Sequence, residues 1–356
     1  MATKAEDLSA RNIDQDSLDK AERIPELLVS SDSHIDEPGD LWDELPADMR
    51  AQLPPIPVWT ADNRPEGGLN PKIRVEHMDL DKVAAEVLYP TTALRAFNKP
   101  QAAQEQAFRL YNDWVADYCK TSPKRLFAVP CLCVYDIDWA IKEMQRCNDM
   151  GLLGGLVWQV PDPALPFTSD HYDPLWAAAA EIGLPINFHI LSGHSYNVAE
   201  LKGIEIVRAS VNIKTADAIT TLFDLIWSGV FSRHPKLKVE MVESEIGFMP
   251  FTIQQWDYYY NRFKDSPDRG GFPINRLPSE IFNEHVYATF MDDYVGSQAL
   301  NFWGEKNCMW SSDYPHGNMT WPNSRAFIAK QIGDLDYATQ ERLISQNVID
   351  LYRLEL

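Results

Sequence analysis

Short apolar runs alternate with amphipathic stretches along almost the whole chain, and this alternation limits its fold more than any other feature. Eight runs have the length and composition of buried strands. They cover residues 27–31, 85–90, 126–132, 155–160, 184–189, 237–242, 285–290 and 309–313. The helical stretches cover residues 74–82, 101–119, 137–150, 174–182, 215–228, 251–263, 324–332 and 337–351. Because strands that alternate with helices form a parallel sheet, and eight such units close on themselves, the sequence predicts an α/β protein built as a (β/α)8 TIM barrel.

The same pattern predicts one barrel domain over residues 26–356. Residues 1–25 are polar and charged, and we expect them to form an arm that packs on the surface or on a neighbouring subunit. Residues 39–72 are rich in Pro, Asp and Trp and have no clear period. Since so long a connection inside a compact domain is usually functional, we expect this insertion to lie over the mouth of the barrel.

Composition narrows the class of protein and its partners. The 356 residues include 32 basic and 52 acidic side chains, and the net charge of −20 disfavours nucleic acid and anionic membranes as partners. No apolar run reaches about 18 residues and no secretory leader opens the sequence, so we expect a soluble, cytoplasmic protein. The five cysteines are odd in number and lack CxxC spacing, which favours buried free thiols over disulfides or a zinc knuckle.

Metal-competent side chains stand at the ends of three predicted strands. Asp32 and His34 are two residues apart, so on a strand they point to the same face. His189 ends the fifth run, and Asp313 ends the eighth. In a TIM barrel the carboxyl ends of all strands meet at one mouth, so we expect these four side chains to converge on a metal ion.

Glu243 follows the sixth run, where an unpaired carboxylate is costly to bury. We therefore expect it to be exposed or to pair with a cation, either the metal or His316. By strand alternation Glu243 should face the same way as Met241 and opposite to Val242.

Several motifs, taken together, are specific for one family. They are Asp32-Ser33-His34 with Glu37-Pro38, Tyr111-Asn112-Asp113-Trp114, Tyr172-Asp173-Pro174-Leu175-Trp176, His234-Pro235, Trp310-Ser311-Ser312-Asp313-Tyr314-Pro315-His316, and Gln346-Asn347-Val348. In these motifs the chain resembles the amidohydrolase-related family, and within it the branch of aminocarboxymuconate-semialdehyde and aromatic acid decarboxylases. The resemblance covers nearly everything from residue 27 to residue 356.

The resemblance implies a distorted TIM barrel with one divalent metal, usually zinc or manganese, held by Asp32, His34, His189 and Asp313. The chain departs from the family pattern at two places. Its first-strand pair is Asp-x-His, which makes the site richer in oxygen and shifts the expected metal from zinc towards manganese or iron. Many relatives carry a catalytic His where this chain has Glu243, so an acid/base group of the decarboxylation mechanism is replaced.

Further candidates lie near the predicted strand ends. Catalytic roles are expected for Asp313, His316 and Glu243. His194 and Arg95 are candidates for binding substrate, the arginine because its guanidinium can hold a carboxylate in bidentate fashion. Glu37 and Glu243 are additional candidates for metal ligands.

Three functions remain open at this point. The first is a metal-dependent, non-oxidative carboxy-lyase acting on an aromatic or unsaturated carboxylic acid, with Asp313 or His316 as proton donor. The second is a metal-dependent hydrolase of an amide, ester or lactone, with Asp313 as general base. The third is an oxygenase with a dinuclear iron site, since the carboxylates and histidines could supply two metals. We expect one ion of zinc, manganese or iron, with two ions as the alternative, a small-molecule substrate, and a homodimer or higher homo-oligomer.

Overall fold

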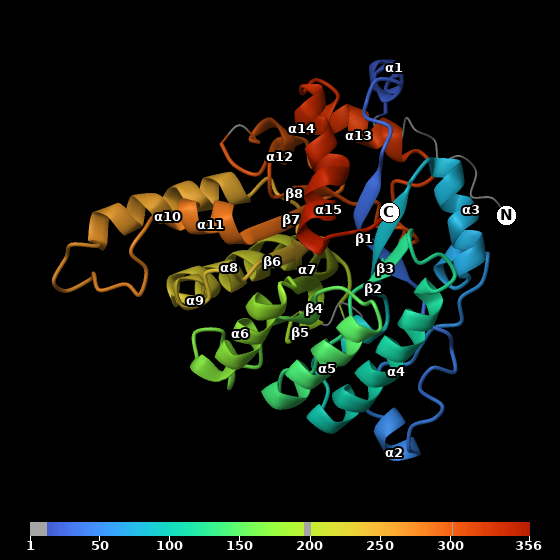
Figure 1. Ribbon diagram of the computed structural model, residues 1–356, viewed down its shortest axis with the longest axis horizontal. Coiled ribbons are helices and arrows are strands. Elements are labelled where there is room, and N and C mark those ends of the chain that lie inside the picture. Colours follow the sequence, from blue (N-terminus) through green and yellow to red (C-terminus); the bar gives the residue numbers. More distant parts are fainter. Residues whose placement is uncertain (1–12, 196–200, 301) are drawn as a thin grey trace.

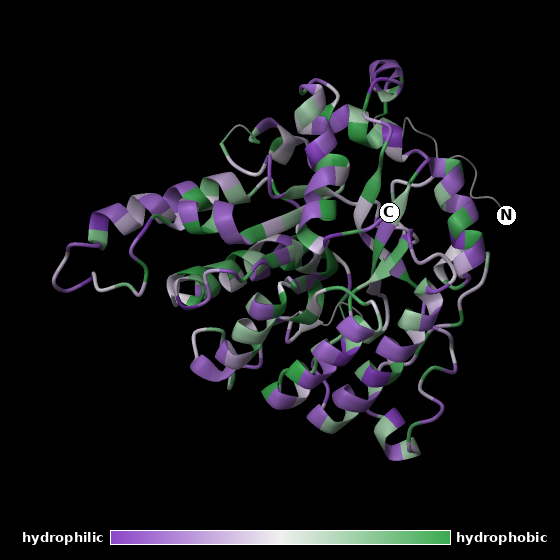
Figure 2. Cartoon of the chain, in the orientation of Figure 1, coloured by the Kyte–Doolittle hydropathy of each residue, from purple (hydrophilic) through white to green (hydrophobic). Residues whose placement is uncertain are grey.

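The computed structural model describes residues 13–195, 201–300 and 302–356, and eight parallel strands lie at its centre (Figure 1). The strands are β1 (Val29–Ile35), β2 (Ala85–Pro90), β3 (Leu126–Ala128), β4 (Gly155–Val160), β5 (Ile186–Gly193), β6 (Val239–Val242), β7 (Val286–Phe290) and β8 (Cys308–Trp310). Almost all strand residues are buried, as expected for a parallel sheet that is covered by helices. Green residues recur along the central strands in Figure 2, whereas the surrounding helices carry many hydrophilic residues.

The strands form a barrel whose hydrogen-bonded ladder is interrupted at two places. One sheet has the order β1-β2-β3 and the other has the order β4-β5-β6-β7-β8. A single parallel bridge, Cys131 to Leu156, joins the end of β3 to β4. On the other side, the N–H of Asp313 donates to the carbonyl of Asp32 at 3.1 Å, which connects the chain after β8 to β1. The prediction of a distorted TIM barrel is confirmed.

Helices and helical turns surround the strands. They are α1 (Gln15–Ala21), α2 (Ala47–Arg50), η1 (Glu66–Gly68), α3 (Pro71–Asp81), η2 (Ala93–Ala96), α4 (Gln101–Cys119), α5 (Ile137–Asp149), η3 (Asp170–Tyr172), α6 (Asp173–Ile182), α7 (Ile204–Asn212), η5 (Ile213–Asp217), α8 (Ala218–Trp227), α9 (Val230–Arg233), α10 (Met249–Phe263), α11 (Pro278–His285), α12 (Tyr294–Gln298), α13 (Ser324–Ile332), α14 (Tyr337–Glu341), η6 (Arg342–Gln346) and α15 (Asn347–Tyr352). Helices α10 and α11 extend away from the barrel on one side (Figure 1). Among the described residues, no helix combines the length and the apolar character that a membrane crossing requires.

The amino-terminal segment that the sequence presented as a polar arm contains α1, which packs against α13. Asp14 caps this helix by accepting a hydrogen bond from the N–H of Ser17 at 2.9 Å. Ile13 is buried against Phe327, and Arg325 donates to backbone carbonyls just after the helix. This segment is therefore attached to the carboxyl-terminal part of the same chain.

The insertion over residues 39–72 returns to the loop that follows β8. Its Arg64 donates to the carbonyl of Pro315 at 3.0 Å, and the carbonyl of Gly68 accepts from the N–H of Asp36 at 3.0 Å. Trp59 donates from its indole nitrogen to the carbonyl of Glu37 at 3.1 Å. These contacts place residues 59–68 beside the carboxyl ends of β1 and β8.

Candidate metal centre

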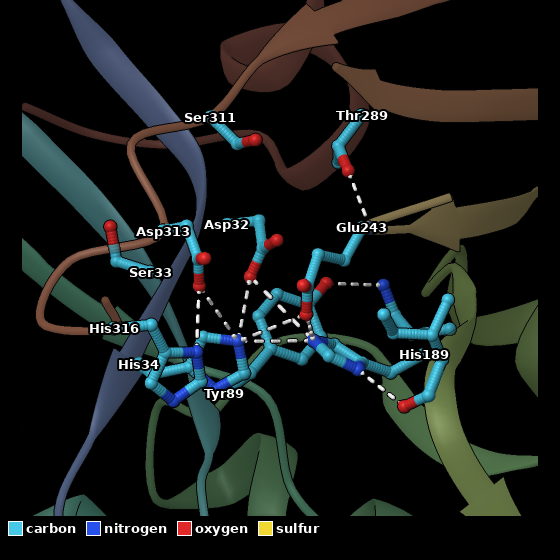
Figure 3. Close-up of polar contacts among 12 residues, drawn as sticks. Asp32, Ser33, His34, Tyr89, His189, Glu243, Thr289, Ser311, Asp313 and His316 are labelled. Carbon is cyan, nitrogen blue, oxygen red and sulfur yellow. Dashed lines mark hydrogen bonds and ion pairs between the residues drawn. The ribbon is translucent and has the colours of Figure 1, made fainter. Parts of the chain in front are cut away.

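Three carboxylates and two imidazoles meet at the carboxyl ends of the strands (Figure 3). Asp32 and His34 come from β1 and His189 comes from β5. Glu243 is the first residue after β6, and Asp313 lies three residues after the end of β8. Side chains from strand ends that are distant along the chain therefore lie in one cluster, and Glu243 lies in it together with the four predicted ligands Asp32, His34, His189 and Asp313.

The two histidines are oriented by hydrogen bonds on the outer side of each ring. Nδ1 of His34 lies 2.9 Å from the carbonyl of Pro90, and Nδ1 of His189 lies 2.8 Å from the carbonyl of Ile190. A carbonyl only accepts, so each Nδ1 carries the proton and each Nε2 carries a lone pair. The two Nε2 atoms lie 3.1 Å apart. Two lone pairs that face each other at this distance repel, and a cation between or beside them would remove that repulsion.

Carboxylate oxygens surround the two nitrogen lone pairs. Nε2 of His34 lies 3.5 Å from Asp32 Oδ1, 3.6 Å from Asp313 Oδ1 and 3.8 Å from Glu243 Oε2. Nε2 of His189 lies 3.8 Å from Asp32 Oδ1 and 3.6 Å from Glu243 Oε2. Donor atoms that share one ion at about 2.0–2.2 Å lie about 3.0–3.6 Å from one another. The observed separations fit a site for one ion with small adjustments of the side chains.

Local backbone conformation brings two of these carboxylates into the barrel mouth. Glu243 has φ = 59° and Asp313 has φ = 52°, in the left-handed region that residues other than glycine rarely adopt. Glu243 follows the end of β6 in this left-handed conformation, so the alternation of the strand does not set the direction of its side chain, which faces the site. The expectation from alternation is corrected here for that reason. The N–H of Glu243 donates to Thr289 Oγ1 at 2.7 Å, which stabilises the turn.

The strand pairing is irregular next to Asp32 and next to His189. The pairing of β1 with β2 shifts register between Ser30 and Ser33, the stretch that contains Asp32. The pairing of β4 with β5 shifts between Trp158 and Val160, opposite the residues that follow His189. Bulges of this kind re-aim side chains and are frequent beside active sites.

Asp32 and Asp313 are fully buried, and the only side-chain nitrogens described beside their oxygens belong to histidines. All four carboxylate oxygens of Asp32 and Asp313 are inaccessible and make no well-aligned hydrogen bond with the described residues. Burial raises the pKa of Asp313 well above its usual range, with Asp32 adding to the shift, and burial and Asp313 raise the pKa of Glu243 to about 7. Buried anions that lack partners are strongly unfavourable. A divalent cation removes this cost, and the nitrogen and oxygen donors suit zinc, manganese or iron.

The imidazoles respond to the same surroundings in opposite ways. Burial lowers the pKa of His34 well below its usual range, and the neighbouring His316 and His189 add to this effect. Burial also opposes the charged form of His189, but the neighbouring carboxylate of Asp32, together with Glu243, outweighs burial and raises the pKa of His189. Neutral imidazole is the form that binds a metal, so the environment of His34 favours ligation.

Two overlapping sets of four residues can hold an ion. The first set is Asp32, His34, His189 and Glu243, and the second is His34, Glu243, Asp313 and His316. Both sets use His34, whose Nδ1 already faces the Pro90 carbonyl. The lone pair on its Nε2 can bind only one ion. The two sets therefore compete for His34, and the arrangement favours a single ion.

His316 connects this cluster to the protein surface. Its Nδ1 lies 2.8 Å from Asp313 Oδ1, its Nε2 lies 3.2 Å from Thr91 Oγ1, and its ring stacks on His34 with centroids 3.9 Å apart. Burial lowers the pKa of His316 to about 4. The negative charge of Glu243 opposes this shift, and the positive charge of Arg64 adds to it. The side chain is 18% exposed, whereas Asp313 is fully buried.

Arg64 supplies a positive charge beside the site. Its guanidinium lies 5.0 Å from the ring of Trp59, and Nε lies 3.8 Å from Asp36 Oδ1. With these residues it lines a pocket of about 210 Å³ next to the loop that carries His316. The sequence reasoning missed this residue; its only signal was a basic side chain next to tryptophan inside the unusually long insertion.

The other residues singled out from the sequence have different surroundings. Both carboxylate oxygens of Glu37 accept from the backbone N–H of Thr92, at 2.8 and 3.0 Å, and Oε1 also accepts from Ala93 at 2.9 Å. Glu37 thus supports the start of η2 and belongs to neither set of potential ligands found among the described residues. Arg95 is exposed on η2. His194 lies 3.6 Å from Asp162 and 3.4 Å from the hydroxyl of Tyr135, at the end of β5.

Comparison with known proteins identifies the family. The chain belongs to the amidohydrolase family, whose model matches residues 47–354. It is 26% identical over 306 residues to gamma-resorcylate decarboxylase from Rhizobium sp. (strain MTP-10005), covering 83% of this chain and 86% of the relative. It is 25% identical over 305 residues to 2-amino-3-carboxymuconate-6-semialdehyde decarboxylase from Dictyostelium discoideum, covering 80% of this chain and 77% of the relative.

A solved structure extends the comparison to the fold. Dihydroxybenzoic acid decarboxylase from Polaromonas sp. JS666, with bound manganese and the inhibitor 2-nitroresorcinol, matches with a TM-score of 0.67. Sequence identity is 18%, and the match covers 92% of this chain and 97% of that chain. The resemblance read from the sequence motifs is confirmed, and the chain is an enzyme of the amidohydrolase superfamily.

Proposed function

We propose that this enzyme is a metal-dependent carboxy-lyase that removes the carboxylate of an aromatic acid without an oxidant. The observation that carries the proposal is the position of Asp313. Its carboxyl lies between the ligand cluster and His316, a partly exposed imidazole 2.8 Å away. The names of the relatives support the same class of reaction.

The proposed metal site is formed by Asp32, His34 and His189, and the carboxylates of Asp313 and Glu243 lie beside it. A divalent cation held there would supply a Lewis acid for an acidic substrate. Manganese is favoured by the oxygen-rich donors, and the Polaromonas relative binds it. Unsaturated acids remain within the substrate class, because the Dictyostelium relative is named for a muconate semialdehyde.

The reacting ring carbon receives its proton from Asp313. The ring supplies the electron pair for the new C–H bond, and the C–C bond to the carboxylate then breaks, so that its electron pair restores aromaticity as carbon dioxide leaves. Asp313 becomes a carboxylate and regains a proton from His316, whose Nδ1 lies beside it. Thr91 orients the other nitrogen of that ring and the partly exposed edge exchanges protons with solvent.

Arg64 and Glu243 have supporting roles in this proposal. Arg64 lies in the pocket beside the site, and its guanidinium attracts and orients an anionic substrate. Glu243 lies beside both Nε2 atoms and completes the donor set before substrate binds. His194 and Arg95, the substrate-binding candidates from the sequence, stay proposals for more remote parts of the substrate.

One experiment separates the proposed reaction from hydrolysis and from oxygen chemistry. Manganese-loaded enzyme is incubated with a panel of hydroxybenzoates and a panel of esters and lactones, while carbon dioxide, proton release and oxygen are followed separately. The proposal expects carbon dioxide from at least one hydroxybenzoate with no oxygen consumed. Proton release from esters without carbon dioxide from any acid would instead assign hydrolase activity.

A homo-oligomer is proposed on the basis of the apolar surface around α10, α11 and α12. A groove of about 500 Å³ lies there. Phe251 and Phe302 line it and are 68% and 84% exposed. Exposed aromatic side chains beside a groove are typical of protein interfaces. Sedimentation analysis of the enzyme and of Phe251→Asp tests this, because the proposal expects the substitution to reduce the mass of the assembly.

A further inference from the structure

Four buried polar side chains form one hydrogen-bonded network in the interior of the barrel. They are Tyr89 on β2, Asn187 on β5, Glu240 on β6 and Tyr352 on α15. The hydroxyls of the two tyrosines lie 2.9 Å apart, and Asn187 Nδ2 lies 2.9 Å from the Tyr89 hydroxyl and 2.7 Å from Glu240 Oε2. Tyr352 also donates to Glu240 Oε2. The network therefore joins three strands to the last helix of the chain.

Tyr89 connects this network to both histidines of the metal centre. Its ring centroid lies 5.3 Å from that of His189 and 6.4 Å from that of His34 (Figure 3). Asn187 lies two residues before His189 on β5, so both side chains face the interior. A shift of the Tyr89 ring would therefore change the space available to both imidazoles.

Glu240 is the common acceptor of the network. Its Oε2 faces Asn187 and both tyrosine hydroxyls, whereas its Oε1 is buried and has no partner among the described residues. Burial raises the pKa of Glu240 to about 8, with the charge of Asp32 adding to this effect. A neutral carboxyl can accept these hydrogen bonds without adding a further negative charge below the metal centre.

We infer that Tyr89, Asn187, Glu240 and Tyr352 form a positioning network for His34 and His189, through which helix α15 sets the affinity of the site for its metal. The inference rests on the proposed metal site, since it concerns how the ligands of that site are held. The network residues touch neither substrate nor metal and act through the two imidazoles. Supporting groups of this kind typically change metal affinity by about 10- to 100-fold when they are removed.

The test compares variants that remove or keep the hydrogen bonds. Tyr352→Phe removes one hydroxyl and keeps the ring, and Glu240→Leu removes the common acceptor. Glu240→Gln keeps an acceptor oxygen in the place of Oε2. Tyr172→Phe is the matched control, because Tyr172 is buried and its hydroxyl also bonds, accepting from Trp158 at 3.0 Å and donating to Leu165.

Each purified variant is titrated with Mn²⁺, and free and bound ion are measured by electron paramagnetic resonance together with the spectrum of the bound ion. The melting temperature in chelator reports structural damage separately. We expect Tyr352→Phe and Glu240→Leu to weaken Mn²⁺ binding by about 10-fold or more with an altered bound spectrum. Glu240→Gln should bind as the wild type does, and Tyr172→Phe should lower only the melting temperature.

Unchanged affinity and spectrum in Tyr352→Phe and Glu240→Leu, with only a lower melting temperature, would overturn the inference and leave the metal site in place. If Glu240→Leu does not fold, Tyr89→Phe takes its place, because it removes a hydroxyl of the network and keeps the ring. A wild type that binds no more Mn²⁺ than His34→Ala would instead refute the proposed metal site, and the inference with it.

Discussion

Replacing Asp32 by Asn should change the stability of the enzyme in opposite directions with and without metal. Asp32 is fully buried, its two oxygens lack donors, and it lies beside His34 and Glu243. Without a cation, its charge is close to other carboxylates and unfavourable. With a cation, the same charge is a ligand. The substitution keeps the size of the side chain and removes only the charge.

The structure gives the scale of both effects. Ligand atoms of Asp32 and Glu243 lie within 4.8 Å of each other. At that separation two unit charges repel by about 3.5 kcal/mol at an effective dielectric constant of about 20. Partial protonation reduces this, so Asp32→Asn should raise the free energy of unfolding of the metal-free protein by about 1–3 kcal/mol. If metal affinity falls about 100-fold, the stabilisation at a metal concentration of 1,000 wild-type Kd values falls from about 4.1 to about 1.4 kcal/mol.

Urea unfolding in chelator and in excess Mn²⁺ measures both quantities on the same protein. Asp36→Asn is the matched control, since Asp36 is also buried after β1 without hydrogen-bond donors but belongs to neither ligand set. It should leave the metal-dependent gain of stability unchanged. A metal-free Asp32→Asn enzyme that is less stable than the wild type, or one that gains as much from Mn²⁺ as the wild type, would refute the reasoning.

Four further substitutions test the proposed proton donor, the proposed substrate contacts and the stability of the fold. Asp313→Asn should reduce the rate of carbon dioxide release by about 10²–10⁴-fold while a hydroxybenzoate still quenches intrinsic fluorescence on binding, and retained turnover would exclude Asp313 as proton donor. Arg64→Gln should raise KM for an aromatic acid about 10-fold, with a smaller effect on kcat. The control Arg95→Gln, at an exposed position on η2, should change KM much less. If Arg95→Gln raises KM more than Arg64→Gln does, the substrate carboxylate binds Arg95 instead. Burial opposes the ionisation of Glu143, but hydrogen bonds from Arg146 and other donors hold its pKa at about 2, below its ordinary value of 4.5. The stabilisation from Glu143 is therefore present above pH 4.5 and lost as the pH falls towards 2, so Glu143→Gln should cost about 1–2 kcal/mol at pH 7 and little at pH 2, measured by urea unfolding at both pH values.

Much of the fold follows from periodicity in the sequence. The predicted bounds of β2, β4, α4 and α13 agree with the structure at both ends, because long or strongly apolar segments leave little choice of conformation. Strand β3 is shorter than predicted, since Pro130 follows it and has no N–H for the ladder. Helix α1 was missed because only seven residues form it and its stability comes from packing on α13, which the local sequence does not record.

The sequence predicts those site residues that stand at the end of a regular strand. It does not predict the residues whose position depends on tertiary contacts. Asp32, His34 and His189 follow from strand ends and the barrel geometry. The inward direction of Glu243 depends on a left-handed residue that alternation cannot anticipate. Arg64 meets Pro315 across a separation of 251 residues, and no local pattern indicates such a contact.

The most direct measurement of the central claim is the release of labelled carbon dioxide from gamma-resorcylate that carries ¹³C in its carboxyl group. The manganese-loaded enzyme, its chelator-treated form and His34→Ala are compared in sealed vessels without oxygen. The account predicts one ¹³CO₂ for each molecule of acid consumed by the loaded enzyme, and none from the other two samples. Consumption of acid with the label retained in the product, or equal ¹³CO₂ release by His34→Ala, would contradict it.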